Sequence, residues 1–429
     1  MSELSRSVRT PGAVLMGLGS IVGTGLFVSI ALATQVAGNA VIIAVFIAAV
    51  VAALNGLSSA QLAAAYPVSG GTYEYGNRVL GSRIGFTAGW MFLTAKSASA
   101  ATAALGSSGY LLYTFGIEAG PFLFTGISLG ILLLLTVLVS GGISRSNTAN
   151  KVIVGFTLFG LAVLAGAGLW VNGIPTEPVA LAFTGLEVDS LLFASALMFV
   201  AYTGYGRIAT LGEEVAEPRK TIPKAIITAM IVIVVLYGIV ALTALQAMGA
   251  EAFGATLNGE AAPLMVVAQL MELPLVGLIV SLAAITAMAG VLLNLILGLS
   301  RVMLSMARRG DLPQKVAVIN PASKSPVTAV WLTGLIIALL VLSGDIRFTW
   351  SFSAFTVLIY YSITNLSAFL LPAELRLYPR IIPALGFVSC VGLAFWIQPE
   401  IILLGTGFIA AGLLWHEAVL RTGHKKEIA

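Results

Sequence analysis

Residues 17–27 read Gly-Leu-Gly-Ser-Ile-Val-Gly-Thr-Gly-Leu-Phe, and residues 199–206 read Phe-Val-Ala-Tyr-Thr-Gly-Tyr-Gly. Both stretches place closely spaced glycines inside an apolar segment. A helix that crosses a membrane keeps its backbone N–H and C=O groups paired, because lipid offers no water to replace those bonds. Breaks are therefore tolerated only inside protein or along a cavity, and one break in each half of a chain indicates the binding site of a transporter.

The composition supports a membrane protein. The chain has 429 residues, of which 59% are hydrophobic and 9% charged, whereas soluble domains carry roughly 25% charged residues. About twelve apolar stretches approach the ~20 residues that span a bilayer. They are residues 12–36, 40–66, 84–115, 121–140, 149–172, 189–211, 223–248, 275–306, 326–343, 347–371, 382–398 and 400–420.

Charged residues alternate between the loops. If the N-terminus is cytoplasmic, most of the 22 Lys and Arg residues fall in the tails and in the loops on the same side. The opposite loops carry Arg347 and mainly acidic residues, among them Glu177, Glu251 and Asp345. This is the positive-inside pattern. It predicts a multi-pass protein of the cell (plasma) membrane, in the lipid bilayer, with both termini cytoplasmic.

The two breaks fall in the first and sixth stretches, so five spans separate equivalent features. Because five is odd, the two halves must insert with opposite orientations. The predicted fold is an all-α membrane protein with 12 transmembrane helices, built as a five-plus-five inverted repeat with broken helices 1 and 6. We expect one transmembrane domain over 1–429, with repeats at about 12–172 and 189–371 and two appended helices at about 382–420.

Several classes of function are disfavoured. The net charge of +4 follows the loops and is no nucleic-acid signature. Cys390 is the single cysteine, so no intramolecular disulfide is possible and no thiol metal site is expected. His416 and His424 lie near the end of the last stretch, where we expect interfacial side chains. Acidic residues avoid the span centres, so an embedded enzyme is disfavoured, and we expect no metal and no cofactor.

An unwound turn at mid-membrane offers two kinds of polar group. A half-helix that starts there presents free N–H groups, which suit a carboxylate, and one that ends there presents free carbonyls, which suit an ammonium. A zwitterionic amino acid matches both. The candidate groups are the backbones of Ile21, Gly23, Thr24 and Gly25, the Thr24 hydroxyl, the carbonyls near Val200 and Thr203, and the adjoining Gly204. Close helix packing by small residues is the alternative explanation of these glycines.

Three segments resemble the amino acid–polyamine–organocation (APC) superfamily. Residues 21–27 look like its first-helix motif, and residues 213–226 look like its signature after the sixth helix. Residues 294–310 are similar to the end of its eighth helix. The resemblance implies the five-plus-five repeat and amino acid or amine substrates. It also implies carboxylate binding at the amides of residues 23–25 and amine binding at carbonyls of Ile21, Val200 and Thr203.

Matching to relatives also bears on ion coupling. Sodium-coupled relatives place hydroxyl ligands on the eighth helix, at positions that match Gly290 and Val291, with Thr286 one turn away. Some proton-coupled relatives place a lysine on the fifth helix, and Thr157 stands at the matching position. Neither glycine nor valine supplies a side-chain oxygen. We therefore expect that sodium is not coupled at this place.

Lys96 is a charged residue in the middle of an apolar span. It lies about twelve residues into the third stretch, or about 18 Å deep at 1.5 Å per residue. A charge there is costly and by default marks a functional site. Three roles stay open: attraction of an acidic substrate side chain, carriage of a proton, and a structural contact. In relatives this stretch borders the substrate side chain.

Other charged and aromatic residues surround the second break. Arg207 follows it directly, with Glu213 and Glu214 as expected neighbours in a gate or a proton-linked pair. Phe199 and Tyr202 flank the break and are the aromatic candidates for contacting substrate. Trp90 and Tyr205 are further gate candidates.

The predicted function is secondary active transport of α-amino acids by alternating access. We expect protons as the coupled ion and neutral substrates, with acidic ones left open by Lys96. Cationic substrates are disfavoured, since no mid-membrane Asp or Glu is available for them. An exchanger without ion coupling is the first alternative. A passive channel is the second, although no repeated filter sequence is present.

Overall fold

The computed structural model describes residues 9–66, 71–142, 147–209, 215, 217–258 and 261–427. In this part of the chain the regular structure is helical, apart from an isolated bridge residue at Val215. The helices of the first half are α1 (Thr10–Ile21), α2 (Thr24–Phe27), α3 (Ser29–Ala37), α4 (Val41–Ala65), α5 (Thr72–Leu80), α6 (Ser82–Thr114), α7 (Pro121–Ser140), α8 (Asn147–Asn172) and α9 (Thr176–Leu181). Those of the second half are α10 (Val188–Tyr202), α11 (Gly206–Ala209), α12 (Pro218–Ala255), α13 (Pro263–Leu270), α14 (Pro274–Arg308), α15 (Val327–Val341), α16 (Ile346–Phe369), α17 (Ile381–Ala394) and α18 (Pro399–Glu427).

Both predicted breaks are present. α1 ends at Ile21, and Gly23 takes up an extended backbone conformation before α2 begins. A second bend at Val28 separates α2 from α3. The second break is milder than expected, because residues 203–205 tighten into a 3₁₀ turn between α10 and α11 instead of unwinding.

Each predicted apolar stretch is helical, yet the count of spans by length and apolarity is lower than twelve. Eight segments of the described chain are long and apolar enough to cross a membrane, and α1, α15 and α17 are shorter apolar helices. The 33-residue α6 is not among the eight. Alanine, serine, threonine and glycine fill its sequence, which lowers its hydropathy. The twelve-span inverted repeat therefore stays a prediction.

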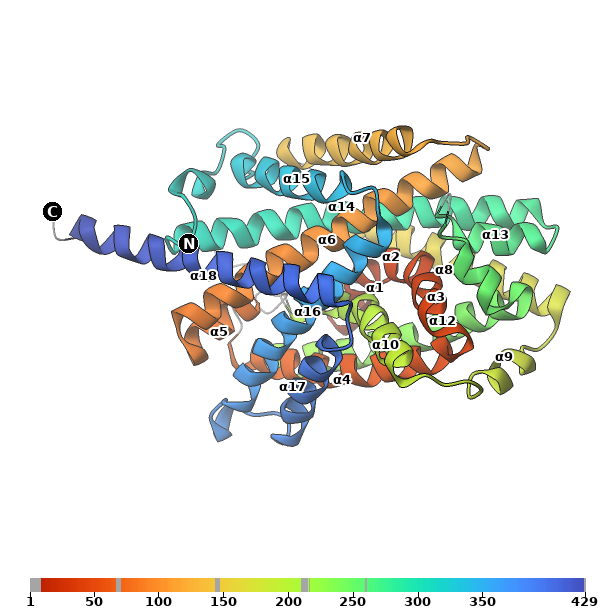
Figure 1. Cartoon of the computed structure of the whole chain (residues 1–429). Helices are drawn as coiled ribbons and strands as arrows, with labels where there is room; N and C mark the ends of the chain where they lie inside the picture. Colours follow the sequence, from red (N-terminus) through yellow and green to blue (C-terminus); the bar gives the residue numbers. More distant parts are fainter. Residues whose placement is uncertain are drawn as a thin grey trace.

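The core lies around α6, which packs against α16 and α14. α4 packs against α12 and α10, and α7 lies beside α15 (Figure 1). Small residues permit this close approach. A Cβ added to Gly106 of α6, for example, would lie 2.9 Å from the sulfur of Met288 in α14. Van der Waals packing of small residues is the main source of helix association in lipid.

Two helix ends have clear local causes. α14 stops at Arg308, and Gly310 follows with φ +87°. Asp345 caps α16 by accepting hydrogen bonds from the backbone N–H groups of Arg347 and Phe348.

One expectation at the end of the chain is wrong. His416 is not interfacial but fully buried, because the end of α18 packs onto α6. The side chain of His424 lies outside the described residues.

Candidate functional site

The two breaks are in direct contact. A Cβ added to Gly204 would lie 2.6 Å from the carbonyl carbon of Ser20 and 2.7 Å from a side-chain carbon of Ile21. Gly25 meets α10 in the same way, with Ala201 2.7 Å from its ideal Cβ. The glycines therefore serve close packing as well as the breaks themselves.

A cavity of about 510 Å³ borders this contact. Eight of the predicted site residues line it: Ile21, Thr24, Gly25, Lys96, Val200, Thr203, Gly204 and Arg207. Ser99 and Trp350 also line the cavity. The indole N–H of Trp350 donates a hydrogen bond to the carbonyl of Leu197 in α10. Exposed Arg301 and Arg308 line the cavity as well, so it reaches the protein surface where α14 ends.

The first break carries unused hydrogen-bonding groups. Thr24 is buried, and its hydroxyl has no hydrogen-bond partner among the described residues. The carbonyl of Gly23 accepts from the N–H groups of Leu26 and Phe27. No donor within the described chain reaches the Ile21 carbonyl, and the N–H groups of Thr24 and Gly25 open a new helix. Buried polar groups without partners are rare and are often completed by a ligand.

The second break is more fully satisfied by the protein itself. The Val200 carbonyl accepts from both the backbone N–H and the hydroxyl of Thr203. The Thr203 carbonyl accepts from the Tyr361 hydroxyl at 3.3 Å, and the Ala201 carbonyl accepts from Tyr237 at 2.9 Å. The Val200 carbonyl is thus less available to a substrate amine than the sequence alone indicates.

Lys96 reaches the second break from α6. Its Nζ donates to the Thr203 hydroxyl oxygen at 2.8 Å, and its side chain is 9% exposed. No carboxylate in the described part of the chain forms an ion pair with it. The ammonium therefore faces the cavity with a hydroxyl, and not a counter-ion, as its protein partner.

Four predicted site residues do not line the cavity. Gly23 packs against Val291, and Thr157 uses its hydroxyl on the carbonyl of Ile153 in its own helix. Phe199 and Tyr202 are buried behind the cavity, where the Tyr202 hydroxyl donates to the carbonyl of Val45.

The other residues that the sequence suggested as gates differ in their positions relative to the cavity. Trp90 turns away from the cavity and donates to the carbonyl of Phe408 in α18. Tyr205 is buried against Tyr361, with ring centroids 5.5 Å apart. Arg207 lines the cavity, whereas Glu213 and Glu214 lie outside the described residues.

Sequence reasoning missed part of the lining. Asn294 borders the cavity from the middle of α14, in the apolar run of residues 291–297. A lone amide in such a run is a usable signal. Phe92, Tyr360 and Tyr361 also line the cavity, but nothing in the sequence separates them from packing aromatics.

Comparison with known proteins identifies the family. The sequence model for amino acid permeases matches residues 12–417, nearly the whole chain. The chain belongs to the amino acid permease family. This permease is therefore a multi-pass membrane transporter of the APC superfamily, and not an enzyme.

The chain is also similar to individual transporters, two of which are named for different substrates. An uncharacterized transporter of Mycobacterium tuberculosis is 36% identical over 412 residues, covering 96% of this chain and 90% of its own. A branched-chain amino acid permease of Bacillus subtilis is 29% identical, covering 79% and 75%. A methylthioribose transporter of the same organism is 30% identical, covering 78% and 74%.

Proposed function

We propose that this permease is a secondary active transporter of neutral α-amino acids in the plasma membrane, driven by protons and not by sodium, with both termini cytoplasmic. The observation that carries the proposal is the cavity at the contact of two broken helices. Its chemistry matches the two charged ends that all α-amino acids share. Branched-chain relatives support an apolar side chain.

The substrate carboxylate is assigned to the first break. The N–H groups of Gly23, Thr24 and Gly25 surround the start of α2, and the buried Thr24 hydroxyl supplies one more donor. The amine is assigned chiefly to the free carbonyl of Ile21. Val200 and Thr203 contribute less, since their carbonyls already accept bonds within the protein.

The charges around the cavity argue against cationic substrates. Lys96, Arg207, Arg301 and Arg308 line it, and none of the described lining residues is Asp or Glu. A second positive charge on a substrate would meet cations without a carboxylate to offset them. Neutral substrates avoid this repulsion.

Lys96 is assigned the role of proton carrier. Its only hydrogen-bond partner in the described structure is a hydroxyl. Either the ammonium or the neutral amine can therefore occupy this position, because loss of the proton leaves no carboxylate without its counter-ion. Sodium binding is disfavoured at the position that sodium-coupled relatives use on the eighth helix. The matching positions, Gly290 and Val291, carry no side-chain oxygen, and Thr286 one turn away would supply a single hydroxyl.

The cavity is open on the side where α14 ends, which the charge pattern assigns to the cytoplasm. Transport would then require a second state, in which this mouth closes and the far end near Trp350 opens. Alternating access around a fixed central site is the general mechanism of such folds.

The test is uptake of radiolabelled amino acids, and of methylthioribose, into proteoliposomes. Each is run with a pH gradient, with a sodium gradient, and with unlabelled substrate inside. The proposal expects leucine uptake that follows the pH gradient, and loss of that dependence in Lys96→Met. Uptake only against internal substrate indicates an exchanger, and strict sodium dependence refutes the coupling assignment. Uptake that never concentrates the amino acid above its external concentration, even with a pH gradient imposed, indicates a channel.

A further inference from the structure

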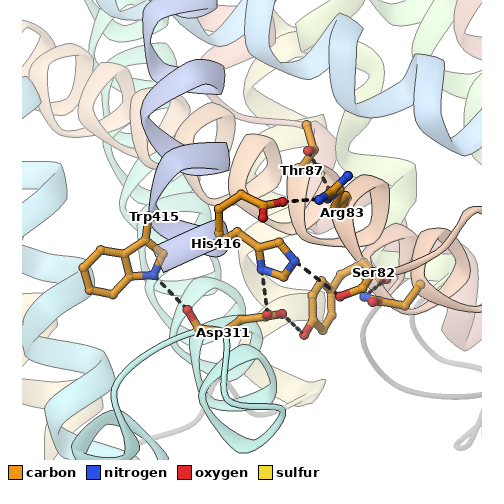
Figure 2. Close-up of polar contacts among 9 residues, drawn as sticks. Ser82, Arg83, Thr87, Asp311, Trp415 and His416 are labelled. Carbon is orange, nitrogen blue, oxygen red and sulfur yellow. Dashed lines mark hydrogen bonds and ion pairs between the residues drawn. The ribbon is translucent and has the colours of Figure 1, made fainter. Parts of the chain in front are cut away.

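A polar cluster ties α18 to α6 and to the segment after α14 (Figure 2). His416 of α18 is fully buried, and its Nδ1 lies 3.2 Å from a carboxylate oxygen of Asp311, an ion-pair distance without hydrogen-bond alignment. Its Nε2 lies 3.4 Å from the Ser82 hydroxyl, and its ring stacks on Phe86 with centroids 4.5 Å apart.

Asp311 is the centre of this cluster. Its second carboxylate oxygen accepts from the Tyr73 hydroxyl at 2.6 Å, and its backbone carbonyl accepts from the indole N–H of Trp415 at 2.9 Å. Burial, and then the bond to Asp311, raise the pKa of Tyr73, so that it stays a donor. We call Tyr73, Ser82, Asp311 and His416 the α18 latch, because they tie α5, α6 and the segment after α14 to α18.

The charged groups beside the latch carry an excess of negative charge when His416 is neutral, although the Arg83 side chain is 70% exposed. Two ion pairs flank the latch, Arg309 with Glu74 and Arg83 with Glu417. Together with Asp311 they give three carboxylates and two guanidinium groups. A proton on His416 would balance this set. It would place a positive charge at Nδ1, 3.2 Å from the Asp311 carboxylate, while Nε2 donates to Ser82.

The latch is attached to the wall of the cavity. Gly71 and Arg308 both line the cavity. Gly71 stands two residues before Tyr73, and Arg308 directly precedes Arg309, which pairs with Glu74. The start of α5 and the end of α14 are therefore held together at the mouth, whereas the facing wall from Ser20 and Arg207 has no residue in the latch.

We propose that the α18 latch is a proton-operated latch, in which protonation of His416 tightens the docking of α5 and α18 onto the end of α14. The imidazolium–carboxylate attraction is present while His416 is protonated. It is lost when the ring becomes neutral. The mouth wall is then firmer at the lower pH.

Hydrogen exchange measured by mass spectrometry tests the latch without any transport assay, so its failure is separate from failure of the proposed function. The full-length permease is compared at pH 5.5 and pH 8, with rates corrected for intrinsic exchange. Amides of α5 are expected to exchange at least about threefold more slowly at pH 5.5. The stability that a partly buried charged pair contributes corresponds to at least that change in exchange rate. Peptides from α15, which contains no latch residue, are the internal control.

Two variants assign the effect. His416→Gln keeps a polar side chain but does not titrate, and Asp311→Asn keeps an acceptor for Tyr73 without its charge. Either variant is expected to remove the pH dependence of α5 exchange. If one fails to fold, as judged by reactivity of the buried Cys390 thiol, the other still decides. Equal corrected exchange at both pH values in the unmodified permease, or an unchanged pH dependence in a folded variant, overturns the proposal.

Discussion

Adding a single methyl group at Gly204 tests whether the two broken helices depend on their contact. In Gly204→Ala the new Cβ would lie 2.6 Å from the carbonyl carbon of Ser20, whereas ordinary contact begins at 3.4 Å. The obstacle is backbone and cannot rotate away, so the breaks must separate by most of an ångström. Overpacking of this kind costs about 1–3 kcal/mol.

The same substitution at Gly238 is the matched control. Gly238 lies in α12 with nothing within 4 Å of an added Cβ. Alanine there is expected to stabilise by about 0.5–1 kcal/mol, because it restricts the unfolded chain. The two variants add the same atoms to helical segments and differ only in what those atoms meet.

Both stability and transport are measured. Cys390 is the only cysteine and is buried, so a thiol-reactive fluorophore reports unfolding directly. Gly204→Ala is expected to melt below the unmodified permease and Gly238→Ala at or above it. If the strain falls on the binding site, leucine uptake drops by about 5- to 150-fold, at tenfold per 1.4 kcal/mol. Equal melting and equal uptake in the two variants would refute the contact between the breaks.

Three further predictions use other residues. Thr24→Val removes a buried hydroxyl without a partner, so stability is expected to hold or rise while KM for leucine rises about three- to tenfold; unchanged KM removes Thr24 from the site. Thr203→Val removes the acceptor of Lys96, and uptake under a pH gradient is expected to fall at least about tenfold, with a charged donor left unpaired; full uptake contradicts the Lys96 assignment. Asp345→Ala removes the cap of α16 and is expected to cost about 1 kcal/mol of stability without changing KM, whereas Asp345→Asn restores the cap; equal melting of the two variants argues against capping.

The breaks and the helices were predictable because their signals are local. Clustered glycines within apolar runs have few explanations in lipid, and each apolar run is long enough to specify a helix. The degree of unwinding was not predictable. At the 3₁₀ turn of residues 203–205, the Thr203 carbonyl accepts from Tyr361, and just before it the Ala201 carbonyl accepts from Tyr237. Both hydroxyls come from distant helices.

Placement of side chains around the site was harder for the same reason. Phe199 and Tyr202 flank the second break in sequence, yet helix rotation turns them behind the cavity. Thr157 was chosen by matching to relatives, and its hydroxyl bonds within its own helix. His416 looked interfacial from its position near the chain end, whereas it is buried against α6, which lies some three hundred residues earlier in the chain.

The low apolarity of α6 has a consequence for biosynthesis. This helix carries Lys96 and many small residues, so it gains little from entering lipid alone, and a central lysine opposes entry by about 2.5–3.5 kcal/mol. Its main partners, α14 and α16, begin at Pro274 and Ile346 and are synthesised much later. We expect α6 to be held by the insertion machinery, or to sit loosely in the bilayer, until those helices emerge. Truncation of the chain before α14 should therefore leave α6 poorly integrated, even though every residue of α6 is present.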